Sequence, residues 1–157
     1  TYAQGKLVLW SARSGRVDAQ GEVLKTQKGA DGTRLDKLAV ADPRLAPYGE
    51  AAMQVLNHLG VMSAWQPQLV IGSSIGQTYQ YAATENASLG FVALSQVWQE
   101  GRLTGGSMWL VPQTLYSPIK QDAILLNPGK GQPAAQAFLS FLRTDKAMQI
   151  MRGFGYE

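Results

Sequence analysis

Cysteine is absent from this chain of 157 residues, and histidine occurs only once, at His58. The first absence excludes disulfides and thiolate metal sites, and the second excludes a metal site built from several histidines. A chain without cysteine suits an oxidising and a reducing compartment equally well, so this absence does not indicate where the protein works.

Charged residues are also few, at 16% of the chain, and the formal net charge is +3. This mildly basic balance allows an anionic partner, but it is far from the lysine- and arginine-rich composition of nucleic-acid binders. No run of like charges marks a basic arm or an acidic tail. We therefore expect no nucleic-acid partner.

Long apolar runs are missing as well. No run approaches the length needed to span a membrane, and no basic start leads into an apolar stretch as in a signal peptide. The chain begins with Thr1 rather than Met, and a strand-like run follows almost at once, which leads us to expect a processed chain or a fragment. Its length suits one domain or one large lobe, and a hydrophobic fraction of 45% suits a globular core.

Short apolar runs alternate with amphipathic segments along the chain. Bounded apolar runs predict buried strands, and apolar residues spaced at i, i+3, i+4 and i+7 predict helices. Strands are expected at residues 6–10, 38–41, 69–71, 89–94, 107–111 and 122–126. Helices are expected at residues 22–28, 50–59, 75–84, 95–100, 133–142 and 145–152. The alternation predicts an α/β fold with a mostly parallel sheet flanked by helices.

The stretch LVIGSSIGQTYQYAATENASLGFVALSQ, residues 69–96, places glycine and serine between a strand and a helix. Gly72-x-Ser74-x-Gly76 matches the nucleophile elbow of serine hydrolases. That fold requires a histidine after the serine in chain order, whereas His58 precedes Ser74. We interpret His58 as a surface residue near the end of a helix, where positive charge is favourable. Hydrolysis is therefore the weakest interpretation that we retain.

The same stretch also suits an anion site. The first turn of a helix has N–H groups without partners and a dipole that favours negative charge. Ser73 and Ser74 add hydroxyl donors, although serine is also a common N-cap where nothing binds. Pro47-Tyr48-Gly49 opens the preceding helix. Because helices that follow parallel strands start at one sheet edge, we expect the two helix starts to converge on one small anion.

Four segments, in order, resemble periplasmic molybdate-binding proteins of ABC transporters. LAVADPRLAPYGEAAMQVLNHLG resembles their strand, Asp-Pro loop and Pro-x-Gly turn into a helix, and LVIGSSIGQTYQYAATENASLGFVALSQV resembles the next strand–helix–strand unit. WLVPQTLYSPIKQDAILL resembles the crossing back between lobes, and AAQAFLSFLRTDKAMQIMRGFGYE resembles the C-terminal helices. The resemblance covers nearly everything from Lys6 onward, and residues 13–34 are its least distinctive part.

The resemblance implies two α/β lobes that are joined by hinge strands and close on the ligand. We expect a periplasmic-binding-protein-like (type II) lobe, the hinge strands and part of the other lobe. The implied division is residues 1–12 as a first-lobe or hinge strand, 13–117 as the second lobe, and 118–157 as the hinge return and C-terminal helices of the first lobe. The family's N-terminal first-lobe segment is expected to be missing. Apolar surface near Leu7 and Phe138 would then lack neighbours, and the chain would self-associate.

The resemblance also assigns binding residues. The backbone N–H groups of Tyr48 and Ile75 are expected to donate to the oxyanion. Supporting roles are expected for Gly49, Ser73 and Ser74. Some relatives add a tyrosine hydroxyl from the strand after Leu-Gly. This chain has Ala93 at that place, so that ligand is missing and the shell must differ in detail.

The implied function is to bind molybdate or tungstate in the periplasm and deliver it to an ABC permease, with no catalysis, no cofactor and no metal held by side chains. A shell made only of donors favours a fully deprotonated anion, because an acidic O–H would find no acceptor. Sulfate would be rejected by its size. Two alternatives stay open: a binding protein of the same fold for another oxyanion or small solute, and a serine hydrolase that uses Ser74.

Overall fold

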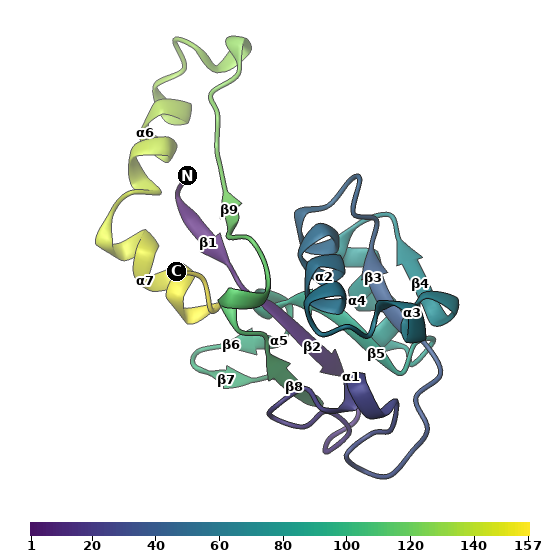
Figure 1. Ribbon diagram of the computed structural model, residues 1–157. Helices are drawn as coiled ribbons and strands as arrows, with labels where there is room; N and C mark the ends of the chain where they lie inside the picture. The colour runs from purple at the N-terminus through teal and green to yellow at the C-terminus, as the bar shows by residue number, and fades with distance from the viewer.

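The computed structural model describes the whole chain, from Thr1 to Glu157, and contains a main body and a projecting arm (Figure 1). The body is built on a five-stranded sheet of order β4-β3-β5-β2-β8. Its strands are β2 (Leu7–Ser11), β3 (Leu38–Ala41), β4 (Leu69–Gly72), β5 (Leu89–Ala93) and β8 (Ser107–Leu110). The arm consists of β1 (Ala3–Gly5), β9 (Ile119–Gln121), α6 (Pro133–Phe141) and α7 (Asp145–Gly153).

The sheet of the body is mixed. β3 runs parallel to both β4 and β5, as the alternation of strands and helices predicts. β2 instead runs antiparallel to β5 and to β8. It follows β1 after a single residue, Lys6, and so enters the sheet from the arm rather than through a helical crossover. The expected mostly parallel sheet is therefore parallel only in its β4-β3-β5 part.

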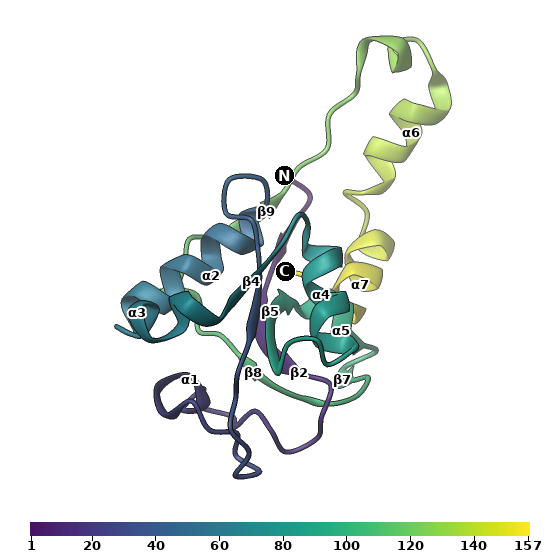
Figure 2. The same ribbon diagram turned by 90° about the vertical axis from the view of Figure 1, so that its right-hand side faces the viewer.

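Helices cover both faces of this sheet, as the two views show (Figures 1 and 2). The helices of the body are α1 (Val23–Thr26), α2 (Pro47–His58), α3 (Met62–Trp65), α4 (Ile75–Ala83) and α5 (Leu94–Val97), with short 3₁₀ turns η1 (Gln66–Gln68) and η2 (Gln113–Leu115). In Figure 2, α2 and α3 lie on one side of the strands and α4 and α5 on the other. α2, at 12 residues, is the longest helix, and none of the helices could span a bilayer.

Both faces of the central strands are buried. Along β2, Leu7 and Leu9 join the larger apolar cluster beneath α2, whereas Val8 and Trp10 join a smaller cluster beneath α4. Successive strand residues point to opposite faces, so a strand covered on both sides must be apolar throughout. This explains the uninterrupted apolar run that marked β2 in the sequence.

The position of β2 corrects one expectation. Leu7 was expected to lie with the first lobe and to lack neighbours, but it is fully buried between β5 and β8. Phe138, on α6, is 59% exposed, as expected, and α6 contains no buried residue. The amphipathic stripe of α6 therefore faces solvent in this structure.

Two further differences from the expected elements concern where helices begin and end. α2 begins at Pro47, three residues earlier than expected, because proline suits the first helical position. The helix expected at 95–100 ends at Val97, and a hairpin of β6 (Trp98–Gln99) and β7 (Arg102–Leu103) follows. Its two turn residues, Glu100 and Gly101, both have positive φ, as a tight hairpin turn requires.

The strand expected at residues 122–126 does not form. The last regular pairing of β9 is Gln121 with Ala3, and the partner strand then ends near the N-terminus. Asp122 contacts the amino group of Thr1 at 2.9 Å, and no strand remains for the following residues to pair with. β9 (Ile119–Gln121) occurs just before the expected range, and η3 (Asn127–Gly129) just after it.

Paired backbones hold the parts of the arm together. β1 pairs antiparallel with β9, and the backbone of Gln4 exchanges hydrogen bonds with that of Glu157 at the C-terminus. Lys6 and Glu157 also form an ion pair of 2.6 Å. Both chain ends therefore lie on the arm, where Figure 1 marks them.

Two glycines let helix starts lie directly against strand ends. A Cβ added to Gly49, in the first turn of α2, would lie 2.2 Å from the carbonyl oxygen of Ala41. A Cβ added to Gly72, at the end of β4, would lie 2.9 Å from the backbone nitrogen of Thr78 in α4. Both contacts involve backbone atoms that cannot rotate away, so only glycine permits this approach.

This geometry predicts opposite effects for two glycines of the same turn. Gly72→Ala should lower the free energy of unfolding by about 1–3 kcal/mol, because the added methyl forces α4 away from the sheet edge. Gly76→Ala should raise it by about 0.5–1 kcal/mol, because alanine favours the helix. An added Cβ there meets nothing closer than 3.7 Å. Urea unfolding of both variants measures the difference, and equal midpoints would contradict the proposed close packing.

Candidate functional site

The starts of α2 and α4 lie at the same edge of the sheet. Ala41 and Gly72 are register partners at the carboxyl ends of the parallel strands β3 and β4. The N–H of Asp42 then donates to the carbonyl of Gly72 at 2.7 Å, which continues the pairing into the loop. Because α2 and α4 cover opposite faces of the sheet, their first turns flank this edge from two sides (Figure 2).

The start of α2 has one free donor in its first turn. Ala46 is the N-cap and has no side chain that could accept a hydrogen bond, and Pro47 has no N–H. Gly49 and Glu50 donate to the carbonyl of Ala46. The N–H of Tyr48 has no partner among the protein atoms, so it is open to a ligand.

The start of α4 is held by two side-chain hydrogen bonds and has several free donors. The hydroxyl of Ser74 accepts from the N–H of Gln77 at 3.2 Å, and the side-chain oxygen of Gln77 accepts from the N–H of Ser73 at 2.7 Å. The N–H groups of Ser74, Ile75 and Gly76 have no partner among the protein atoms. The turn therefore presents three consecutive free donors, as an anion-binding helix start requires.

Gln77 is a residue that our reading of the sequence missed. Ser74-Ile75-Gly76-Gln77 follows the capping-box spacing of serine and glutamine, which could have revealed it. In the usual box the glutamine accepts from the N-cap N–H, whereas here it accepts from the residue before, Ser73. This shift leaves the N–H of Ser74 free.

The predicted supporting residues have distinct positions. The exposed hydroxyl of Ser73 makes no hydrogen bond within the protein, whereas that of Ser74 serves as the N-cap. Gly49 acts through its missing side chain, which brings the first turn of α2 onto the end of β3. Ala93 ends β5 at the same edge and is 3% exposed, and its methyl group provides no hydroxyl donor.

An acidic residue lies at this edge, and an ion pair neutralises it. Asp42 follows β3 directly, and Arg44 contacts its two oxygens at 3.0 and 2.7 Å. The guanidinium lowers the pKa of Asp42 to about 2, so the carboxylate is ionised at neutral pH. Because the two charges cancel, the loop before α2 adds no net negative charge that would repel an anion.

The side chain of Tyr48 has a different function from its backbone N–H, because it packs in the protein interior. It is 8% exposed and belongs to the larger apolar cluster, and its hydroxyl lies against Gly5 of β1 so closely that a Cβ there would overlap it. Burial raises the pKa of this hydroxyl, so the phenol stays neutral. Tyr48 thus links the first turn of α2 to β1 of the arm.

His58 and Ser74 do not form a catalytic pair. His58 ends α2, ten residues after Tyr48, which is about 15 Å along the helix axis from the edge where Ser74 lies. Its Nδ1 is 2.8 Å from the carbonyl oxygen of Leu115, so this nitrogen carries the donated hydrogen. The hydrogen bond of the imidazole ring therefore joins α2 to η2, and His58 is an exposed residue at a helix end, as expected.

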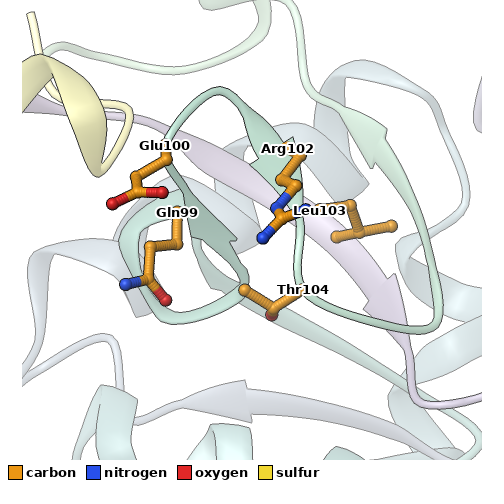
Figure 3. Close-up of a pocket in the computed structure, with 5 residues that line it drawn as sticks. All are labelled: Gln99, Glu100, Arg102, Leu103 and Thr104. Carbon is orange, nitrogen blue, oxygen red and sulfur yellow. The ribbon is translucent and has the colours of Figure 1, made fainter.

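The two largest hollows that we describe lie elsewhere. One of about 330 Å³ is formed by the β6–β7 hairpin with Gln99, Glu100, Arg102, Leu103 and Thr104 (Figure 3). Another of about 420 Å³ lies between this hairpin and α7, with Ile150 and Phe154 among its lining residues. Neither is lined by a residue of the two helix starts.

Comparison with known proteins finds relatives that share one named function. Two curated proteins named molybdate-binding protein ModA, from Azotobacter vinelandii and Rhodobacter capsulatus, are each 54% identical to this chain over 156 residues. These alignments cover 99% of this chain but only 60% and 58% of the relatives, so the chain spans about three fifths of their length.

A solved structure of an Azotobacter vinelandii periplasmic molybdate-binding protein has the same fold. It matches with a TM-score of 0.88 at 40% identity, and the match covers 100% of this chain and 66% of that one. The family model for bacterial extracellular solute-binding proteins matches residues 1–157. Since this match extends over every residue, the chain belongs to the family of bacterial extracellular solute-binding proteins.

Proposed function

We propose that this chain forms part of the binding site of a periplasmic protein that takes up molybdate and tungstate and delivers them to an ABC permease. The observation that carries the proposal is the pair of helix starts with unpartnered N–H groups at one sheet edge. Its support from relatives is 54% identity to two proteins named for molybdate binding.

In this proposal the oxyanion is held by neutral donors. The N–H of Tyr48 donates from α2 and the N–H of Ile75 from α4, with Ser73 and Ser74 in support and Gly49 bringing α2 close. Hydrogen bonds to an ionised acceptor are about twice as strong as those between neutral groups, so a few N–H donors can hold a dianion. A shell without acceptors selects the fully deprotonated form of the ligand.

Selection between oxyanions then depends on size. Sulfate carries the same charge as molybdate but has shorter bonds, so donors spaced for the larger ion would fit sulfate loosely. The same donors could serve a binding protein for another oxyanion or small solute, which is our second candidate because backbone N–H groups bind any compact anion.

We also propose that the arm belongs to a different lobe from the body. The assigned division is residues 1–12 as a first-lobe or hinge strand, 13–117 as the second lobe, and 118–157 as the hinge return and C-terminal helices of the first lobe. The support is that β1, β9 and the C-terminus pair with one another outside the five-stranded sheet, and that β1 continues through Lys6 into β2 of that sheet. Closure of two lobes about such strands would bury the anion and create a surface for the permease to recognise.

Calorimetric titration of the 157-residue chain with molybdate, tungstate and sulfate tests the proposal. We expect heat from the first two anions and none from sulfate at the same concentration, because the donors are spaced for longer bonds. Binding of a different oxyanion alone would favour the second candidate. Absence of heat with every anion tested would overturn oxyanion binding by this chain.

A substitution at Ile75 can remove one donor and keep the helix. Proline is favoured at the first helical position, and the extended backbone of Ser74 suits a residue before proline. Ile75→Pro deletes the N–H and should weaken molybdate binding about 10- to 100-fold, as loss of a hydrogen bond to a charged group predicts. Ile75→Ala keeps the N–H and is the matched control. Equal affinities of the two variants in calorimetry would exclude Ile75 as a donor.

We further infer that the 157-residue chain associates with itself through the arm. On the arm and the segment between β9 and α6, Ile124 is 80% exposed, Leu126 68%, Phe138 59% and Phe141 38%. Exposed apolar surface favours contacts between protein molecules. Light scattering should give a mass above the 17.0 kDa of one chain, and Phe138→Ser should lower it. A monodisperse species of one chain mass would contradict self-association.

A further inference from the structure

The side chain of Gln96 joins the end of β5 to the first turn of α4. α5 follows β5 directly, and Gln96 is its third residue. The side-chain oxygen of Gln96 accepts from the N–H of Ala93 at 2.9 Å. Its side-chain nitrogen donates to the carbonyl of Ile75 at 3.2 Å. The amide thus bridges β5 and α4 at the edge where the free donors lie.

The bridged carbonyl belongs to a peptide that carries a free donor. The carbonyl of Ile75 and the N–H of Gly76 are parts of one planar unit and point in opposite directions. A hydrogen bond to the carbonyl therefore fixes the direction of the Gly76 N–H, which has no protein partner. It also polarises the unit and makes that N–H a stronger donor.

α5 is itself held firmly, so it can serve as a support. Leu94 and Val97 are buried in the smaller apolar cluster, and the N–H of Leu94 donates to the carbonyl of Lys6 at 2.9 Å. The hydroxyl of Ser95 donates to that of Tyr156 at 3.0 Å. Because α5 is anchored on both sides of Gln96, the amide has a fixed base from which to orient the peptide.

We propose that Gln96 is a positioning residue for the oxyanion site, and that it orients the Ile75–Gly76 peptide so that the Gly76 N–H acts as a further donor to the ligand. This inference rests on the proposed function. It also gives Ala93 a role, because the N–H of Ala93 holds the amide oxygen of Gln96.

Only an amide can make both contacts. Glutamate would accept from Ala93 but would repel the Ile75 carbonyl, and methionine has nearly the same length but donates nothing. Gln96→Met therefore removes both hydrogen bonds while it preserves most of the packing. Gln99→Ala is the matched control, because Gln99 lies three residues further on, is exposed, and makes no side-chain hydrogen bond.

The test combines calorimetry with a measurement that needs no ligand. We expect Gln96→Met to weaken molybdate binding about three- to tenfold, as expected for lost hydrogen bonds of ordinary strength, and to reduce the preference for molybdate over sulfate. In the ligand-free protein, the NMR order parameter of the Gly76 amide should fall in Gln96→Met and stay unchanged in Gln99→Ala. Urea unfolding of each variant reports any loss of overall stability.

The outcomes separate the two proposals. An unchanged order parameter and an unchanged molybdate-to-sulfate ratio in Gln96→Met would overturn the positioning role, even if this variant unfolds at lower urea. No binding of any oxyanion by the unmodified chain would overturn the proposed function. A fall of the order parameter would still support the orientation of the peptide by Gln96 in that case.

Discussion

At the carboxyl edge of the sheet, two helices begin in direct backbone contact with two neighbouring strand ends. Gly49 rests on the carbonyl of Ala41, and Gly72 lies against the backbone of Thr78, with no room for a side chain at either glycine. A methyl group at either position would push a helix away from the sheet. The spacing between the donors of α2 and those of α4 depends on these two contacts.

The binding properties of this sheet edge depend on which backbone groups already have hydrogen-bond partners within the protein. The side chains of Gln77 and Gln96 and the hydroxyl of Ser74 take up some of the polar groups near α4, and the N–H groups of Ser74, Ile75 and Gly76 stay free. Asp42 is neutralised by Arg44. What remains is a neutral surface of free N–H donors, which is the arrangement that the proposed binding of a dianion requires.

The arm contrasts with the body in how it is held. Both faces of the central strands in the body are buried, whereas α6 contains no buried residue. The C-terminal segment contacts the body through the N–H of Glu100, which donates to the carbonyl of Gly153, and through Ser95 and Tyr156. Tyr48 connects the two regions, because its backbone belongs to the proposed site and its side chain packs on β1. A movement of the arm relative to the body would therefore change the packing of Tyr48 in the first turn of α2.

The sequence by itself determined the elements whose signal is local. The buried strands Leu38–Ala41 and Leu89–Ala93, the helix Ile75–Ala83 and the glycine-serine turn before it could all be predicted, because apolar periodicity and capping act within a few residues. Only the tertiary structure decided the direction of β2, the failure of residues 122–126 to form a strand, and the bridge from Gln96 to Ile75. Each of these depends on a partner distant in sequence, and a contact between distant residues leaves no periodic pattern in the chain.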